Sequence, residues 1–292
     1  MFSGSLVAIV TPMHADGALD FPAWARLIDF HLENGTSGIV VAGTTGESPT
    51  LSDSELRELT QRACDQAQGR IQIIVGVGSN STATTVERVR WVSQLPVDGV
   101  LIVTPAYNRP TQEGLFRHYE AAAAASRVPV IAYNVPARTA VDLLPATVAR
   151  IAQLPRLVAV KEAEPSVARA REILSLVPST FVVLSGHDAS AREVVLAGGR
   201  GVISVTANVA PRAMADMIGA AMRGDAAGAG KLDARIAPLH EALFVEANPI
   251  PAKWALARMG LMEAALRLPL TELAESFRPE VERALRQTGA LG

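Results

Sequence analysis

A lysine at the end of an apolar run is the residue of this sequence best suited to covalent chemistry. Residues 157–160 carry no polar side chain, which is typical of a strand buried on both faces, and Lys161 follows them directly. An ammonium group removed from water favours its neutral form, and a neutral amine attacks ketones to form a Schiff base. Most lysines are exposed, so a strand-end lysine that simply reaches solvent is the plain alternative. Other residues have to decide between the two.

Short apolar runs and longer helical patterns alternate along most of the chain. The expected strands cover residues 6–10, 38–42, 71–75, 99–103, 129–133, 157–161, 181–185 and 201–205. The expected helices cover residues 22–33, 53–67, 83–94, 112–125, 145–153, 167–177, 189–197 and 211–222. Parallel strands need crossover helices, and eight such units close into an α/β fold, the (β/α)8 TIM barrel. An open, doubly wound sheet is the alternative.

Helix start signals mark several of these boundaries. Ser52 and Glu55 have the spacing of a capping box, and Asp20 precedes a proline in the first turn of the first helix. After the eighth unit the sequence holds helical patterns only, at residues 226–244, 251–259 and 271–288. We therefore expect a barrel over residues 1–224 and a helical C-terminal region over residues 225–292.

Polar residues follow the expected strands at the ends where barrel enzymes carry their chemistry. Thr44 and Thr45 follow the second strand, Tyr107 follows the fourth, and Tyr133 and Lys161 end the fifth and sixth. Two of the chain's three tyrosines and a threonine pair thus converge on the face that holds the lysine. This convergence favours a catalytic lysine over an exposed one.

Two of these features have plain alternatives. In the segment Gly43-Thr-Thr-Gly-Glu47, the glycines let backbone N–H groups cluster around an anion such as a small carboxylate. A turn capped by its threonines explains the same segment without a ligand. Tyr133 either fills space at the strand end or, beside a Schiff-base lysine, relays protons.

Composition argues against several other classes of protein. The formal net charge is −2 and no long Lys/Arg run occurs, so we expect neither a nucleic-acid partner nor membrane binding. The first apolar run has no basic segment before it and is too short for a signal peptide or a membrane span. Because this run is neither a signal peptide nor a membrane span, we expect a cytoplasmic protein. Cys64, the only cysteine, lies on an expected helix as a small buried hydrophobe. His187 and Asp188 are adjacent but lack a third metal ligand, so we expect no metal.

Four segments together resemble one enzyme family. They are Gly43-Thr-Thr-Gly-Glu-Ser48, Tyr133-Asn-Val-Pro-Ala-Arg-Thr139, Val160-Lys-Glu-Ala163 and Phe244-Val-Glu-Ala-Asn-Pro-Ile-Pro251. In order and spacing they are similar to the 4-hydroxy-tetrahydrodipicolinate synthase family, also called the dihydrodipicolinate synthase family. The likeness runs from one end of the chain to the other. The wider superfamily also contains N-acetylneuraminate lyase and other pyruvate-dependent aldolases.

The resemblance implies a lyase of the class I aldolase type in lysine and diaminopimelate biosynthesis. It implies no metal or organic cofactor and usually a homotetramer. Lys161 would form an imine with pyruvate, and the derived enamine would add to L-aspartate 4-semialdehyde. Tyr133 would move protons, linked to water by Thr44 and by Tyr107 from a neighbouring subunit.

The same resemblance implies a set of substrate-binding residues. Thr44 and Thr45 would hold the pyruvate carboxylate, and Arg138 the carboxylate of the semialdehyde, a task suited to a planar bidentate donor. Gly186 and Ile203 would complete the substrate site. Arg138 favours the synthase over a lyase for 2-keto-3-deoxy sugar acids, which needs no such group. A barrel that only senses a keto acid would not need the proton relay.

The chain departs from the family pattern at several positions. Ala140 stands where a glycine is common, His187 where an aspartate is frequent, and Ala106 replaces a second tyrosine before Tyr107. Pro165 replaces a flexible position after the lysine, so we expect the loop beside the imine to take a different path. We also expect weak or absent inhibition by L-lysine, because the residues that replace the inhibited relatives' histidine and glutamate are Asp53, Leu56 and Thr84.

Overall fold

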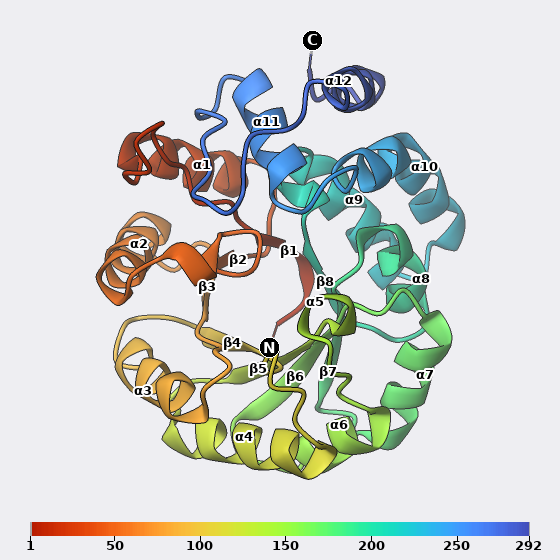
Figure 1. The fold of residues 1–292 in the computed structure, drawn as a ribbon. Coiled ribbons are helices and arrows are strands. Elements are labelled where there is room, and N and C mark those ends of the chain that lie inside the picture. Colours follow the sequence, from red (N-terminus) through yellow and green to blue (C-terminus); the bar gives the residue numbers. More distant parts are fainter. Residues whose placement is uncertain (1, 292) are drawn as a thin grey trace.

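The computed structural model describes residues 2–291 and contains a closed barrel of eight parallel strands (Figure 1). Neighbours along the chain are neighbours in the barrel, and Gly4 of the first strand pairs with Gly201 of the last to close it. The strands are β1 (Gly4–Ala8), β2 (Gly38–Val41), β3 (Gln72–Gly76), β4 (Gly99–Val103), β5 (Val130–Asn134), β6 (Leu157–Glu162), β7 (Val182–Ser185) and β8 (Gly201–Ser204). The predicted TIM barrel is confirmed, and the open sheet is excluded.

Helices surround the barrel, and the last of them lie together at one side of it (Figure 1). The α-helices are α1 (Phe21–Glu33), α2 (Asp53–Ala67), α3 (Thr82–Val92), α4 (Gln112–Ala125), α5 (Pro136–Thr139), α6 (Pro145–Ile151), α7 (Val167–Leu176), α8 (Ala191–Leu196), α9 (Pro211–Met222), α10 (Ala226–Ala242), α11 (Ile250–Arg258) and α12 (Arg278–Gln287). Short 3-10 turns are η1 (Ser48–Thr50), η2 (Asp188–Ser190) and η3 (Thr206–Asn208). No helix among the described residues is long and apolar enough to cross a membrane.

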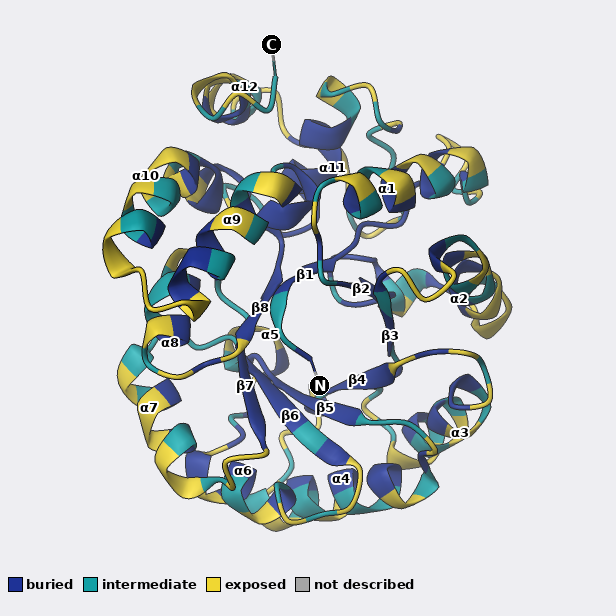
Figure 2. Cartoon of the chain, turned by 180° about the vertical axis from the view of Figure 1, so that it is seen from behind, coloured by how far each residue is buried: buried dark blue, intermediate teal, exposed yellow. Residues whose placement is uncertain are grey.

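The core has two layers, because successive side chains of a strand point to opposite faces. Leu6, Val40 and Ile74 fill the interior of the barrel. Their neighbours Val7 and Ile39 point outward and pack against the helices. Figure 2 shows the result, with buried strands and helices that are buried toward the barrel and exposed on the outside. Strands buried on both faces explain the near-continuous apolar runs of the sequence.

Local signals determine the helix starts where the sequence predicted them. Ser52 caps α2, and the Glu55 carboxylate accepts a hydrogen bond from the Ser52 N–H at 2.8 Å, which completes the predicted capping box. Asp20 caps α1 by accepting a hydrogen bond from the Ala23 N–H at 2.9 Å.

Cys64 is half-buried against the core, and burial raises the pKa of its thiol to about 11.

Predicted and observed helix ends agree to within two residues except in two places. The last helix begins at Arg278, not at residue 271, and Pro279 lies in its first turn. A helix running through residues 271–288 would place this proline in its interior, where the ring clashes with the preceding turn and the N–H is missing. The short helix α5 was not predicted, since it comprises only Pro136–Thr139 and offers no hydrophobic period.

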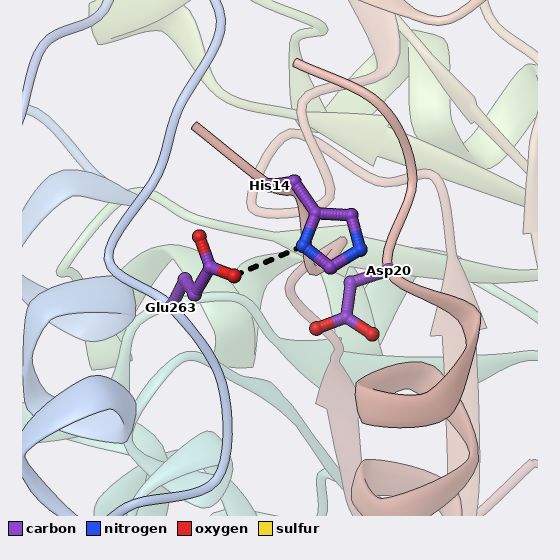
Figure 3. Close-up of side chains that lie close together, drawn as sticks. All are labelled: His14, Asp20 and Glu263. Carbon is purple, nitrogen blue, oxygen red and sulfur yellow. Dashed lines mark hydrogen bonds and ion pairs between the residues drawn. The ribbon is translucent and has the colours of Figure 1, made fainter. Parts of the chain in front are cut away.

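His14, Asp20 and Glu263 link the C-terminal segment to the loop after β1 (Figure 3). The Nδ1 atom of His14 lies 2.9 Å from Oε1 of Glu263, and both side chains are about half exposed. The hydrogen bond to Glu263 is the main cause that raises the pKa of His14, and the Asp20 charge adds to it. The contact between His14 and Glu263 is therefore an exposed one, and two nearby carboxylates favour the protonated form of the imidazole.

Arg267 forms a second, more extensive link between the C-terminal segment and the barrel loops. Its guanidinium donates to the carbonyl oxygens of Gly17 and Thr50 at 2.7 Å each and pairs with Glu55. The hydrogen bond from Arg267 lowers the pKa of Glu55 to about 2. The segment after α11 is thereby joined to the loops that follow β1 and β2.

Candidate active site

Lys161 and Tyr133 are direct neighbours on adjacent strands. The register between β5 and β6 pairs Tyr133 with Lys161, so both side chains leave the sheet on the same face. They are 6% and 5% exposed, and Nζ of Lys161 lies 4.2 Å from the centre of the Tyr133 ring. A buried amine in contact with a phenol has a nucleophile and a proton-transfer group within reach of one small molecule.

The residues that follow this pair form a polar network on the outer face of the sheet. Asn134 donates to both carboxylate oxygens of Glu162 at 3.0 Å. Arg169 of α7 donates to Glu162 at 2.9 Å and pairs with Asp142 at 2.6 Å. Burial is the main cause that raises the pKa of Glu162, and its hydrogen bonds oppose the shift. The network joins the ends of β5 and β6 and so maintains the separation of the Lys161–Tyr133 pair.

Sequence reasoning missed this network. The available signal was the strand alternation, because a polar residue directly after an inward-facing catalytic residue must point outward, into an apolar helix layer. Such a residue needs partners there. The partners themselves, Asp142 and Arg169, come from other elements and carry no sequence mark.

Gly186 lies directly beside Lys161. A Cβ atom at position 186 would come within 2.9 Å of both Cε of Lys161 and Cβ of Ala163. The Gly186 N–H donates to the carbonyl oxygen of Glu162 at 2.7 Å, which keeps the two loops together. Only glycine fits at position 186, because the Lys161 side chain occupies the space that a Cβ atom would need.

Two residues with left-handed backbone bound the loop Gly43–Glu47: Ala42 directly precedes it and Glu47 ends it. Ala42 has φ 51° and Glu47 has φ 55°, a conformation that non-glycine residues rarely adopt. Between them, Thr45 is 2% exposed, and its Oγ1 accepts a hydrogen bond from Nδ2 of Asn248 at 2.9 Å. Thr44 is only half-buried and faces open space.

Two adjoining cavities meet at Thr44. A small one of about 30 Å³ is lined by Thr44 and Tyr133 among others. A larger one of about 500 Å³ is lined by Thr44 and Arg138 and extends to Arg88. Nη2 of Arg138 donates to the backbone oxygen of Asn248 at 3.3 Å. Arg138 thus lies in the larger, outer cavity, while Lys161 and Tyr133 are buried deeper in the barrel.

Two predicted residues lie apart from this arrangement. Ile203 is 1% exposed and belongs to the interior of the barrel, together with Tyr133. Tyr107 is 89% exposed and has φ 72°, and its N–H donates to the carbonyl oxygen of Thr139 at 3.3 Å. The structure of one chain therefore brings Lys161, Tyr133 and Gly186 together but leaves the Tyr107 side chain in solvent.

His187 and Asp188 have structural partners. One oxygen of Asp188 accepts the N–H groups of Val205 and Thr206 at 3.0 and 2.9 Å, which fixes the chain after β8. Nδ1 of His187 lies 3.0 Å from the hydroxyl of Ser190, and burial lowers the pKa of the imidazole. This pair supports the β7 and β8 loops.

Residues 1–288 match the model of the dihydrodipicolinate synthetase family. The chain belongs to this family. It is 52% identical to a 4-hydroxy-tetrahydrodipicolinate synthase of Stutzerimonas stutzeri, with all of both chains covered. A chloride-inhibited dihydrodipicolinate synthase from Acinetobacter baumannii, solved with pyruvate, is 45% identical with a TM-score of 0.98 and complete coverage of both chains. The synthase from Cyanidioschyzon merolae, solved with lysine bound, is 36% identical with a TM-score of 0.96 and 99% coverage of each chain.

Ala140, one of the departures noted in the sequence, has a strained backbone. It adopts left-handed backbone with φ 59° and ends the short helix α5. Glycine takes this conformation without a steric cost, whereas alanine places its Cβ against the following carbonyl. Ala140 therefore carries backbone strain two residues after Arg138.

Proposed function

We propose that the protein is a 4-hydroxy-tetrahydrodipicolinate synthase that condenses pyruvate with L-aspartate 4-semialdehyde. The observation that carries the proposal is the buried Lys161 amine over the Tyr133 ring at 4.2 Å, inside the barrel of a family member. About 50% identity to the named synthases over the full length supports the same reaction. The Arg138 guanidinium in the outer cavity supports an aldehyde that carries a carboxylate.

The reaction begins with attack of the Lys161 amine on the ketone carbon of pyruvate. Loss of water gives the imine, whose positive nitrogen withdraws electrons, so that a methyl proton leaves and an enamine forms. The enamine carbon then adds to the aldehyde carbon, and the new alkoxide takes a proton. The amino group derived from the semialdehyde closes the ring onto the imine carbon, and the lysine is released.

The surrounding residues bind the carboxylates and move the protons of these steps. Tyr133 donates and accepts protons, and Thr44 connects it with the outer cavity. Thr44, Thr45 and the N–H groups of the Gly43–Glu47 loop hold the pyruvate carboxylate. Gly186 leaves the space in which the imine forms. Ile203 acts on the substrate site only through its packing in the barrel interior, in the same apolar cluster as Tyr133.

Tyr107 completes the relay in an oligomer. Its side chain is 89% exposed on a loop with left-handed backbone at Tyr107 and Arg109, a conformation that a contact with a second subunit would stabilise. We therefore propose a homotetramer in which this tyrosine reaches the site of a neighbouring chain. The cytoplasmic location stays a prediction.

Borohydride trapping with pyruvate, read by mass spectrometry, tests the imine, and turnover of aspartate semialdehyde tests the substrate. We expect one reduced pyruvate on Lys161 and none in Lys161→Ala. Arg138→Ala should raise the KM for the semialdehyde and leave the pyruvate adduct unchanged. An adduct without semialdehyde turnover, or an Arg138→Ala variant with unchanged KM, would shift the assignment to another aldehyde.

A further inference from the structure

A buried ion pair connects the C-terminal region with the loop that follows β2. Nζ of Lys253, in α11, donates to Oε1 of Glu47 at 2.6 Å, and the two side chains are 0% and 1% exposed. The residues are 206 positions apart in the chain. A buried ion pair is often no more stabilising than apolar residues of the same volume. Stability alone therefore does not explain why this ion pair lies between α11 and the loop after β2.

The backbone of Glu47 needs support from its surroundings, because it is in the left-handed region. It has φ 55°, and it connects the threonines of the loop to η1. A non-glycine residue keeps this conformation only where the surrounding structure imposes it. Both carboxylate oxygens of Glu47 are engaged, since Lys253 donates to Oε1 and the backbone N–H of Arg267 donates to Oε2 at 3.2 Å. The C-terminal region thus holds the end of the loop from two directions.

The same segment of the chain also holds the centre of the loop. Asn248, five positions before Lys253 and 5% exposed, donates to the hydroxyl of Thr45 at 2.9 Å. From the barrel side, the hydroxyl of Thr11 donates to the carbonyl oxygen of Gly46 at 2.7 Å. The loop is therefore held between the segment that follows β1 and the segment from Asn248 into α11.

We propose that Lys253 is a positioning residue, which acts through Glu47 to hold Thr44 and Thr45 in the geometry that receives the pyruvate carboxylate. The identity of this ligand rests on the proposed function. A loop that is already ordered loses less conformational freedom on binding, so its preorganisation appears as affinity for pyruvate. Lys253 itself touches no substrate in this arrangement.

Two variants and one control separate positioning from stability. Lys253→Met leaves a buried, unpaired carboxylate, so it is expected to unfold at lower urea concentration than the wild type. The double variant Glu47→Gln/Lys253→Met removes both charges and should recover most of this loss. Leu256→Ala creates a cavity in the same helix, at a residue that is 1% exposed, and leaves the Lys253–Glu47 contact in place.

The readouts are the pyruvate concentration at half-maximal borohydride trapping and the hydrogen exchange of a peptide that covers residues 43–47. We expect the single and the double variant to raise the half-saturating concentration about ten-fold, which corresponds to the loss of one charged hydrogen bond. Leu256→Ala should remain within about two-fold of the wild type. The amides of residues 43–47 should exchange faster in both the single and the double variant, and at the wild-type rate in Leu256→Ala.

Recovery of pyruvate affinity together with stability in the double variant would overturn the proposal. An equal rise in half-saturation in Leu256→Ala would do the same. If Lys253→Met fails to fold, the double variant alone decides. If the wild type forms no pyruvate adduct, the proposed function fails, and hydrogen exchange then decides on Lys253: faster exchange in the double variant supports positioning, and unchanged exchange refutes it.

Discussion

Replacing Gly186 with alanine is expected to disable imine formation, because the new methyl group would occupy the space of the lysine. Its carbon would lie 2.9 Å from Cε of Lys161, 2.9 Å from Cβ of Ala163 and 3.1 Å from Cα of Ala163. Carbon atoms in contact need about 3.5 Å or more, so a shift of roughly half an ångström is unavoidable. The loop of Ala163 cannot retreat freely, since Gly186 is hydrogen bonded to Glu162 at 2.7 Å. The end of the lysine side chain therefore moves.

The expected magnitudes follow from this geometry. Overpacking of this kind costs about 1–3 kcal/mol of stability. Displacement of a reacting group by about 1 Å costs about 100-fold in rate, so a shift of half that size is expected to slow imine formation about ten-fold. The assay is the rate of borohydride-trapped adduct formation at fixed pyruvate, with urea unfolding alongside. Gly219→Ala, in α9, is the matched control, because its new Cβ would meet only the guanidinium of Arg223, at 3.4 Å. The free energy of unfolding of the control should rise by about 0.5–1 kcal/mol, because alanine is favoured over glycine inside a helix. Unchanged trapping and stability in Gly186→Ala would refute the reasoning.

Three further predictions concern positions outside the lysine pocket. Ala140→Gly should raise the free energy of unfolding by about 0.5–1 kcal/mol, because glycine adopts φ 59° without strain. The greater entropy of the unfolded glycine variant offsets part of this gain. A lower stability of the variant in urea unfolding would contradict the strain at Ala140. The hydrogen bond with Glu263 raises the pKa of His14 above its ordinary value of 6.5. The ion pair therefore contributes its full stabilisation at pH values below 6.5, and this stabilisation is lost as the pH rises through the raised pKa. Glu263→Gln should therefore lower the Tm more at about pH 5.5 than at about pH 8.5, and an equal loss at both would contradict the assignment. Millimolar L-lysine should leave the activity nearly unchanged, because Asp53 pairs with Arg88 at 2.9 Å and Leu56 is 4% exposed and packed in the core; strong inhibition would show that these residues still form a lysine site.

Much of the barrel was predictable because its signals are local. A strand buried on both faces must be apolar throughout, and an amphipathic helix must repeat its apolar residues, so both appear in any short window of sequence. The capping box of Ser52 and Glu55 is equally local, and the structure contains it. The predicted start of the last helix was wrong, because the helical pattern was extended across Pro279.

The sequence by itself determined the fold class and the placement of Lys161 and Tyr133 at neighbouring strand ends. This was possible because the order of strands in a barrel follows the order in the chain. Only the tertiary structure identified the partners of these residues. The contacts of Glu47 with Lys253 and of Thr45 with Asn248 join positions more than 200 residues apart, and a lysine or asparagine on a helical segment carries no mark of its distant partner. The close approach of Gly186 to Lys161 is likewise a property of packed atoms, which no spacing along the chain expresses.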